Sequence, residues 1–112
     1  MLVGRSAPFG GLTRTRVLLA LVLLPESYPR ELARILGSAN SGVQQALRSL
    51  EKDGLVAGRS VGRTRLFCLD PRYFAARELL SYLNRLASAE PALRESAAAM
   101  RRRPRRTGKP PC

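Results

Sequence analysis

Apolar positions in the first third of the chain follow helical spacing and stop at prolines or glycines. Residues 12–24 are apolar on almost every side of a helix, which is typical of a helix that is buried or lies between subunits, and Pro25 closes it. Residues 27–37 predict a second helix, in which Pro29 is tolerated in the first turn and Gly37 is a suitable stop.

A third helix follows after a few polar residues. Val43, Leu47 and Leu50 fall at i, i+4 and i+7, which is the spacing of one buried stripe, and Gly54 ends the helix. Its start is open, because three residues that can cap a helix stand close together: Ser38, Asn40 and Ser41.

Two short segments after this helix have the residue types of strands. They span residues 55–59 and 64–69, and the connector between them contains Gly62. Glycine supplies the backbone angles that a tight hairpin turn needs. The sequence therefore predicts a two-stranded hairpin directly after the third helix.

Two further helices are predicted beyond the hairpin. Asp70 and Pro71 predict the start of the fourth, since an acidic cap and a proline in the first turn both favour helix initiation. Its apolar side consists of Ala76, Leu79, Leu80, Leu83 and Leu86. Pro91 opens the fifth, whose apolar positions are Leu93, Ala97 and Met100. The long stripe of the fourth helix either covers the domain's own core beside the first helix or joins two subunits.

The order of these elements predicts a mainly α protein with a small β-hairpin. Two helices joined by a tight turn and followed by a hairpin form a winged helix-turn-helix, here with additional C-terminal helices. We expect a loose arm over residues 1–11, the winged helix-turn-helix domain over 12–70, C-terminal helices over 71–100 and a disordered basic tail over 101–112.

Charge adds an indication about the partner. The chain of 112 residues carries 20 lysines and arginines against 8 acidic residues, and 18 of the 20 are arginine. Such an excess attracts polyanions, and the planar guanidinium suits phosphates and guanine edges. The alternative is a soluble surface in a protein whose genome is rich in arginine codons.

Several classes of function are excluded by residues that the chain lacks. It has no histidine and only two cysteines, Cys68 and Cys112, so neither a structural zinc site nor a Ser-His or Cys-His catalytic pair is expected. The glycines form no phosphate-binding loop, so we predict neither an enzyme nor a bound cofactor. A disulfide between the two cysteines would stabilise little, and the expected compartment is the reducing cytoplasm. Residues 17–24 are too short to span a bilayer, and we interpret them as a core helix rather than an export signal.

The segment "RELARILG" followed by "SGVQQALRSLEKDGLVAGRSVGRTRLFCLD" resembles regulators of the ArsR and MarR type. The resemblance covers residues 12–70 and depends on the order of its motifs: Glu31-Leu32-Ala33, Leu36-Gly37, Val43, Leu47, Leu50-Glu51, Asp53-Gly54-Leu55-Val56, Gly62-Arg63, Phe67 and Leu69. It implies a winged helix-turn-helix that binds double-stranded DNA as a homodimer. The cysteine, histidine and acidic clusters of the metal-sensing members have no counterpart in this sequence.

Candidate DNA-binding residues follow from the helical phase of the third helix. If its apolar stripe points inward, the opposite face presents Asn40, Ser41, Gln44, Gln45 and Arg48. Amide side chains form paired hydrogen bonds with adenine, and arginine does so with guanine, so this face is predicted to read bases. The wing is predicted to contact phosphates or a minor groove through Arg59, Arg63 and Arg65.

We therefore predict a sequence-specific transcriptional regulator that represses by occupying its operator. Two alternatives remain. A winged helix can serve as a protein-docking module, with the polar helix face bound to a partner chain. RNA binding ranks lower, because RNA readers stack bases on exposed aromatic residues and these are few here. The tail "RRRPRR" is expected to add electrostatic attraction to any nucleic acid.

Overall fold

The computed structural model describes residues 9–101, so the predicted basic tail apart from Arg101, and most of the predicted N-terminal arm, lie outside the described residues. The elements follow one another in this order: α2 (Leu12–Leu23), α3 (Pro29–Leu36), α4 (Asn40–Lys52), β1 (Val56–Val61), β2 (Thr64–Leu69), α5 (Ala76–Ala87) and α6 (Pro91–Arg101). The predicted class, mainly helical with a two-stranded antiparallel hairpin, is confirmed. In the described residues, no helix is both long and apolar enough to cross a membrane.

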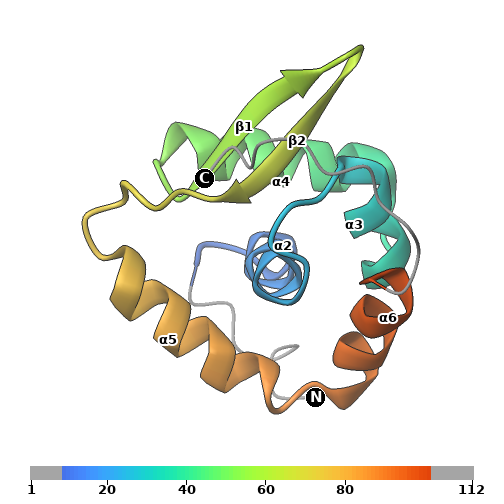
Figure 1. Cartoon of the computed structure of the whole chain (residues 1–112), viewed down its shortest axis with the longest axis vertical. Coiled ribbons are helices and arrows are strands. Elements are labelled where there is room, and N and C mark those ends of the chain that lie inside the picture. Colours follow the sequence, from blue (N-terminus) through green and yellow to red (C-terminus); the bar gives the residue numbers. More distant parts are fainter. Residues whose placement is uncertain (1–8, 102–112) are drawn as a thin grey trace.

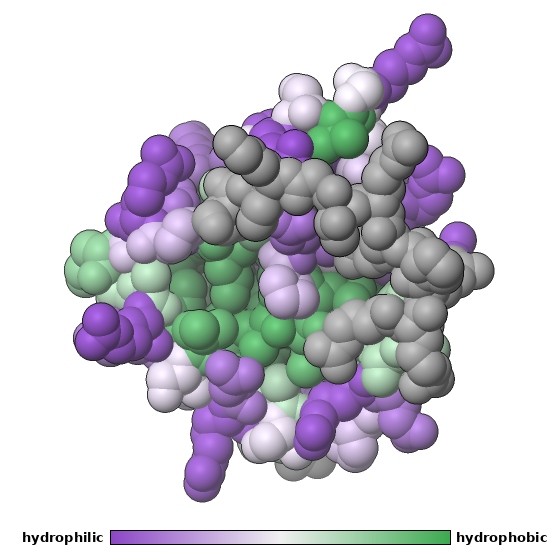
Figure 2. All heavy atoms as spheres, in the orientation of Figure 1, coloured by the Kyte–Doolittle hydropathy of each residue, from purple (hydrophilic) through white to green (hydrophobic). Residues whose placement is uncertain are grey.

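Helix α2 lies in the middle of the molecule. Figure 1 shows it end-on, surrounded by α3, α4, the hairpin, α5 and α6. The side chains from Val17 to Leu21 are at most 1% exposed. This surrounding ring of elements explains why the helix is apolar on almost every side, and it confirms the interpretation as a core helix. In Figure 2 hydrophobic residues gather in the middle of the face shown, and hydrophilic side chains project around its rim.

Helices α3 and α4 form the helix-turn-helix. The Glu31 side chain accepts a hydrogen bond from the backbone N–H of Tyr28 at 3.0 Å, which caps the start of α3, and Gly37 ends the helix as predicted. The structure settles the start of α4 at Asn40, with Ala39 at the cap position and no side-chain cap. Val43, Leu47 and Leu50 are fully buried, as their spacing predicts.

The hairpin is longer than the sequence indicates. Strand β1 continues to Val61 and pairs with Thr64, so the turn consists of Gly62 and Arg63 alone. Gly62 has a φ of +62°, a backbone angle that residues with a side chain rarely adopt. Backbone hydrogen bonds of 2.9 Å in both directions between Ser27 and Phe67 attach the segment before α3 to the outer edge of β2.

The predicted start of the fourth helix at Asp70 and Pro71 is wrong, because α5 begins only at Ala76. The Asp70 carboxylate accepts the backbone N–H of Arg72 at 2.9 Å, and the Asp70 carbonyl accepts that of Tyr73 at 3.1 Å. These bonds close a turn instead of a helix. Burial raises the pKa of Asp70, but the hydrogen bonds and charge of Arg72 outweigh that effect and leave the pKa below its ordinary value.

Helices α5 and α6 complete the enclosure of α2. Leu79, Leu83 and Leu86 of α5 are buried in the main core, so the apolar stripe of α5 covers the subunit's own core. Leu80 was expected in this stripe but is 45% exposed, because it lies about 100° around the helix from Leu79. The predicted apolar positions of α6 are all buried, and two of them pack with Leu24.

Candidate nucleic-acid interface

The outward side of α4 carries two lines of polar residues. Asn40, Gln44 and Glu51 are spaced i, i+4 and i+11, which places them on one line along the helix. The second line, further from the core, contains Ser41, Gln45 and Arg48. All five residues predicted to read bases are exposed, so α4 presents a continuous polar surface without a packing partner among the described residues.

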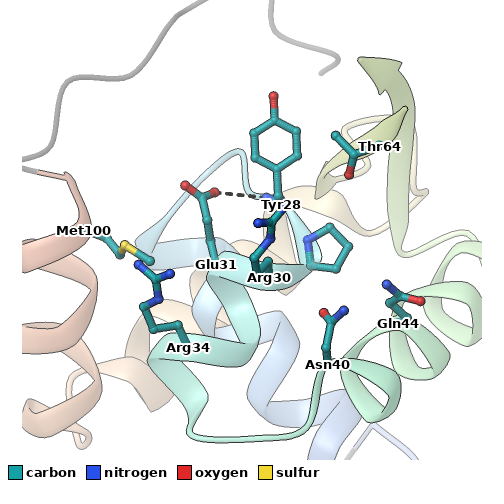
Figure 3. A pocket seen from close by; sticks show the side chains of 9 residues that line it. Tyr28, Arg30, Glu31, Arg34, Asn40, Gln44, Thr64 and Met100 are labelled. Atoms are coloured by element: carbon teal, nitrogen blue, oxygen red, sulfur yellow. Dashed lines mark hydrogen bonds between the residues drawn. The ribbon is translucent and has the colours of Figure 1, made fainter. Parts of the chain in front are cut away.

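Asn40 and Gln44 of the first line border a cleft of about 350 Å³. Figure 3 shows side chains from α3, α4 and the hairpin around this cleft. Its lining consists of Tyr28, Pro29, Arg30, Glu31, Arg34, Asn40, Gln44, Thr64 and Met100. The start of α3, the start of α4 and the wing turn therefore face a common space.

The charge of this cleft is positive. Arg30 and Arg34 lie at i and i+4 on the exposed side of α3 and form no ion pair within the described residues. Among the described lining residues Glu31 alone is acidic, and its carboxylate accepts the N–H of Tyr28. The N-terminus of α4 adds the partial positive charge of a helix start. This combination suits an anionic partner with hydrogen-bonding groups.

The pairing of the two strands places the three arginines predicted for the wing at three different positions of the hairpin. Arg63 lies in the turn and is exposed. Arg59 pairs with Leu66, whereas Arg65 pairs with Ser60, so Arg59 and Arg65 lie on opposite faces of the hairpin. Thr64, which lines the cleft, shares the face of Arg59. The Nε atom of Arg59 is buried and has no hydrogen-bond partner in the described part of the chain.

Arg65 is engaged within the protein. Its Nη1 and Nη2 donate to the two carboxylate oxygens of Glu51 at 2.9 and 2.8 Å, and Nη2 also donates to the carbonyl of Gly58 at 3.1 Å. The guanidinium carbon lies 5.1 Å from the centre of the Phe67 ring. The hydrogen bond with Glu51 raises the pKa of Arg65 above its ordinary value.

Two arginines of α2 hold the ends of the helix-turn-helix. Arg14 donates to the hydroxyl of Ser49 and forms an ion pair of 2.9 Å with Asp53, both near the C-terminus of α4. Arg16 donates to the carbonyl of Leu36, the last residue of α3, at 2.8 Å. A cation at a helix C-terminus is favourable for the helix dipole. Part of the arginine excess is thus structural.

Sequence reasoning missed the contribution of α3 to this surface. Tyr28, Arg30, Arg34 and Thr64 line the cleft but were not among the predicted site residues. A signal was present for two of them, since Arg30 and Arg34 are spaced by four residues and avoid the apolar side of α3. No such pattern marks Tyr28 or Thr64, which reach the cleft through the packing of the hairpin beside α3.

Comparisons with known proteins place this surface in context. No curated protein matches the chain in sequence. The fold is similar to that of the adhesin competence repressor AdcR from Streptococcus pyogenes, with 19% identity, a TM-score of 0.59 and coverage of 92% of this chain and 75% of that one. It is also similar to a mutant of ZitR from Lactococcus lactis in the apo form, with 18% identity, a TM-score of 0.52 and coverage of 80% and 75%.

The family comparison covers more than half of the chain. Residues 12–76, from the start of α2 to the first residue of α5, match the family described as sugar-specific transcriptional regulator TrmB. The predicted resemblance to winged helix-turn-helix regulators is confirmed. Membership also identifies the chain as a regulator that binds DNA rather than an enzyme. The chain belongs to the TrmB family of transcriptional regulators.

Proposed function

We propose that this protein is a sequence-specific repressor that binds double-stranded DNA with α4 in the major groove. One observation carries the proposal: Asn40 and Gln44 line the same cleft as the wing residue Thr64 and as Arg30 and Arg34, which have no ionic partner in the part of the chain that the structure describes. A major groove about 12 Å wide admits one α-helix, and amide side chains at its floor distinguish adenine from other bases. Polar residues that read bases are thus flanked by cations that can hold the backbone.

Base reading is assigned to α4. Asn40 and Gln44 reach bases from the side of the cleft, and the outer line supplies Ser41, Gln45 and Arg48. Glutamine and asparagine pair with adenine through two hydrogen bonds, and arginine pairs with guanine in the same way. Each correctly paired contact is worth roughly 1–3 kcal/mol of discrimination against a wrong base.

Phosphate binding is assigned to arginines on both sides of α4. Arg63 at the wing tip and Arg59, on the hairpin face that it shares with Thr64, act on one side, and Arg30 and Arg34 of α3 act on the other. Contacts with phosphates fix the register of the protein on the duplex without reading sequence. They also make the affinity depend steeply on salt.

The regulator acts as a homodimer in the cytoplasm, beside the DNA that it binds, and represses by occupying its operator. Two-fold symmetry would match two half-sites about one helical turn apart. The enclosure of α2 leaves little of that helix for a partner subunit. The exposed apolar residues lie mostly in or near α5, with Phe74 at 91% and both Leu80 and Tyr82 at 45% exposure.

Selection of duplexes from a random pool, followed by titration, tests the proposal. The double substitution Gln44→Ala and Gln45→Ala is expected to reduce the ratio of specific to non-specific affinity by roughly 1–3 kcal/mol per lost paired contact. Its folding should change by a few tenths of a kcal/mol, since both residues are exposed on a helix. Asn84→Ala on α5 is the matched control, an exposed amide away from the cleft, and should leave both quantities unchanged.

A protein-docking module is the alternative function. A winged helix of this type would bind duplexes weakly and without sequence preference, so selection would enrich no common motif. Failure of the wild-type protein to bind duplex DNA at low salt would contradict the DNA-reading proposal and favour the docking function.

A further inference from the structure

Four residues join the wing to α4, and we refer to Glu51, Gly58, Arg65 and Phe67 together as the wing clamp. Glu51 lies in the last turns of α4, and the other three lie on the hairpin face that is turned toward it. The guanidinium of Arg65 meets the Glu51 carboxylate with two parallel hydrogen bonds, a geometry that fixes orientation as well as distance. The third bond, to the Gly58 carbonyl, ties the same group to β1.

The backbone is shaped to accept this arginine. A Cβ atom added to Gly58 would lie 2.8 Å from Cε1 of Phe67 and 2.9 Å from Nη2 of Arg65. Both approaches are closer than real Cβ atoms show, so no residue with a side chain fits at position 58 without a shift of the clamp. Phe67 is buried in the main core and supplies a fixed ring beside the guanidinium.

The clamp holds Arg65 at Glu51, about two helical turns beyond Gln44, and neither Arg65 nor Glu51 lines the cleft that faces DNA in the proposed function. Its face of the hairpin is opposite to the face of Arg59 and Thr64, and Thr64 borders the cleft. A move of Arg65 to a phosphate would break two charge-assisted hydrogen bonds and leave the Glu51 carboxylate without its cation near a polyanion.

We infer that Arg65 is a positioning residue of the DNA-binding site, which sets the angle of the wing relative to α4 through Glu51 and contacts no phosphate itself. The inference rests on the proposed function and divides the arginines of the wing into two roles. Arg63 at the tip acts on the nucleic acid, and Arg65 at the base keeps that tip where the duplex backbone passes. Sequence specificity then depends on a contact that never touches a base.

The direction in which Glu51→Gln changes the affinity for DNA separates the two roles. If Arg65 bound phosphate, Glu51→Gln would remove a competing anion and raise the affinity for DNA. If Arg65 positions the wing, Glu51→Gln is expected to lower the affinity for the selected duplex by up to about fivefold, the upper end of the range for a partly exposed ion pair. Arg65→Gln should have the same effect, and the double variant should bind no worse than either single one.

The slope of log affinity against log salt gives a second readout. Arg63→Gln, the matched arginine control in the turn, should reduce the slope by about 0.9 for its lost phosphate contact. Arg65→Gln and Arg65→Lys should leave the slope unchanged while lowering the specificity ratio. Amide hydrogen exchange without DNA should show faster exchange in β1 and β2 for both Arg65 variants and for Glu51→Gln, but not for Arg63→Gln.

The outcomes are distinguishable. The positioning role would be overturned if the wild-type protein binds DNA and either Glu51→Gln gains affinity or Arg65→Gln reduces the salt slope. The proposed function would stand in that case. Unchanged hydrogen exchange in the hairpin of all three clamp variants would overturn it independently of DNA. Absence of duplex binding by the wild-type protein would overturn the proposed function, and with it the positioning role.

Discussion

At the scale of single residues, identical side chains have different roles in this protein. Arg14 and Arg16 hold helix ends, Arg65 joins the wing to α4, and Arg30 and Arg34 have no ionic partner among the described residues. A net charge of +12 therefore overstates the surface that is free to meet a polyanion. Contacts inside the fold, rather than residue type, decide which arginines can bind phosphate.

Two glycine substitutions should change stability in opposite directions. Gly58→Ala is expected to destabilise the fold by about 1–3 kcal/mol, because the added methyl group meets Phe67 and Arg65 at overlapping distances. Gly42→Ala, the matched control inside α4, meets nothing within 4 Å and should stabilise the protein by up to about 1 kcal/mol. Urea unfolding of the three proteins checks both values, and a neutral Gly58→Ala would mean that the hairpin can relax around position 58.

The limit of sequence reasoning is also visible at this scale. The exposure of Gln44 and Gln45 follows from the spacing of Val43, Leu47 and Leu50, because helical phase is a local property. The pairing of Arg65 with Glu51 does not follow from any local pattern. It depends on the hairpin register and on the angle at which the hairpin leaves α4, and both are fixed by packing between residues distant in sequence.

At the scale of elements, helices and strands were predictable where the spacing of apolar residues agrees with the positions of prolines and glycines. Residues 12–69 fold into the predicted helices and hairpin, with ends that agree or differ by at most a few residues. The exception is the segment after β2, where Asp70 accepts the N–H of Arg72 within a turn. An acidic cap residue followed by proline occurs both at helix starts and in turns, so this pair does not distinguish the two. The packing of Tyr73 against the core, which the sequence does not reveal, accompanies the turn.

Helix α3 should contribute affinity without contributing sequence preference. Arg30→Gln combined with Arg34→Gln is expected to weaken binding to every duplex and to reduce the salt slope by about 0.9 for each lost phosphate contact. Arg85→Gln on α5 combined with Arg94→Gln on α6 removes the same charge from exposed positions that line neither the cleft nor the α5 groove, and controls for the net charge alone. Titrations over a range of salt concentrations measure the slopes. A change in the preferred sequence for the α3 pair would instead show that this helix reads bases.

At the scale of the whole molecule, α5 divides its surface between the subunit core and an exposed apolar region. Leu80 lies in that region and borders a groove of about 310 Å³ with Leu69, Pro71 and Ala76, and the exposed Phe74 precedes the helix by two residues. Exposed apolar patches of this kind often mark contacts between subunits. We expect this region to form the homodimer interface.

Sedimentation analysis tests that interface. The wild-type protein should sediment as a dimer, and the double substitution Phe74→Ser and Leu80→Ser should shift it toward the monomer without lowering its thermal stability. Leu12→Ser, at an exposed apolar position at the start of α2, serves as the comparison variant and should leave the dimer intact. Dissociation by Leu12→Ser alone would place the interface at α2, and a monomeric wild type would contradict the dimer.

The central position of α2 has a consequence for how the protein is made. This apolar helix is synthesised before the elements that enclose it, and its contacts include α6, which ends at Arg101. At translation rates of about 5–20 residues per second, the side chains from Val17 to Leu21 remain incompletely enclosed for roughly four to sixteen seconds, until α6 has been synthesised. During that interval the nascent chain exposes the kind of apolar segment that chaperones recognise, and its yield in a cell should depend on them.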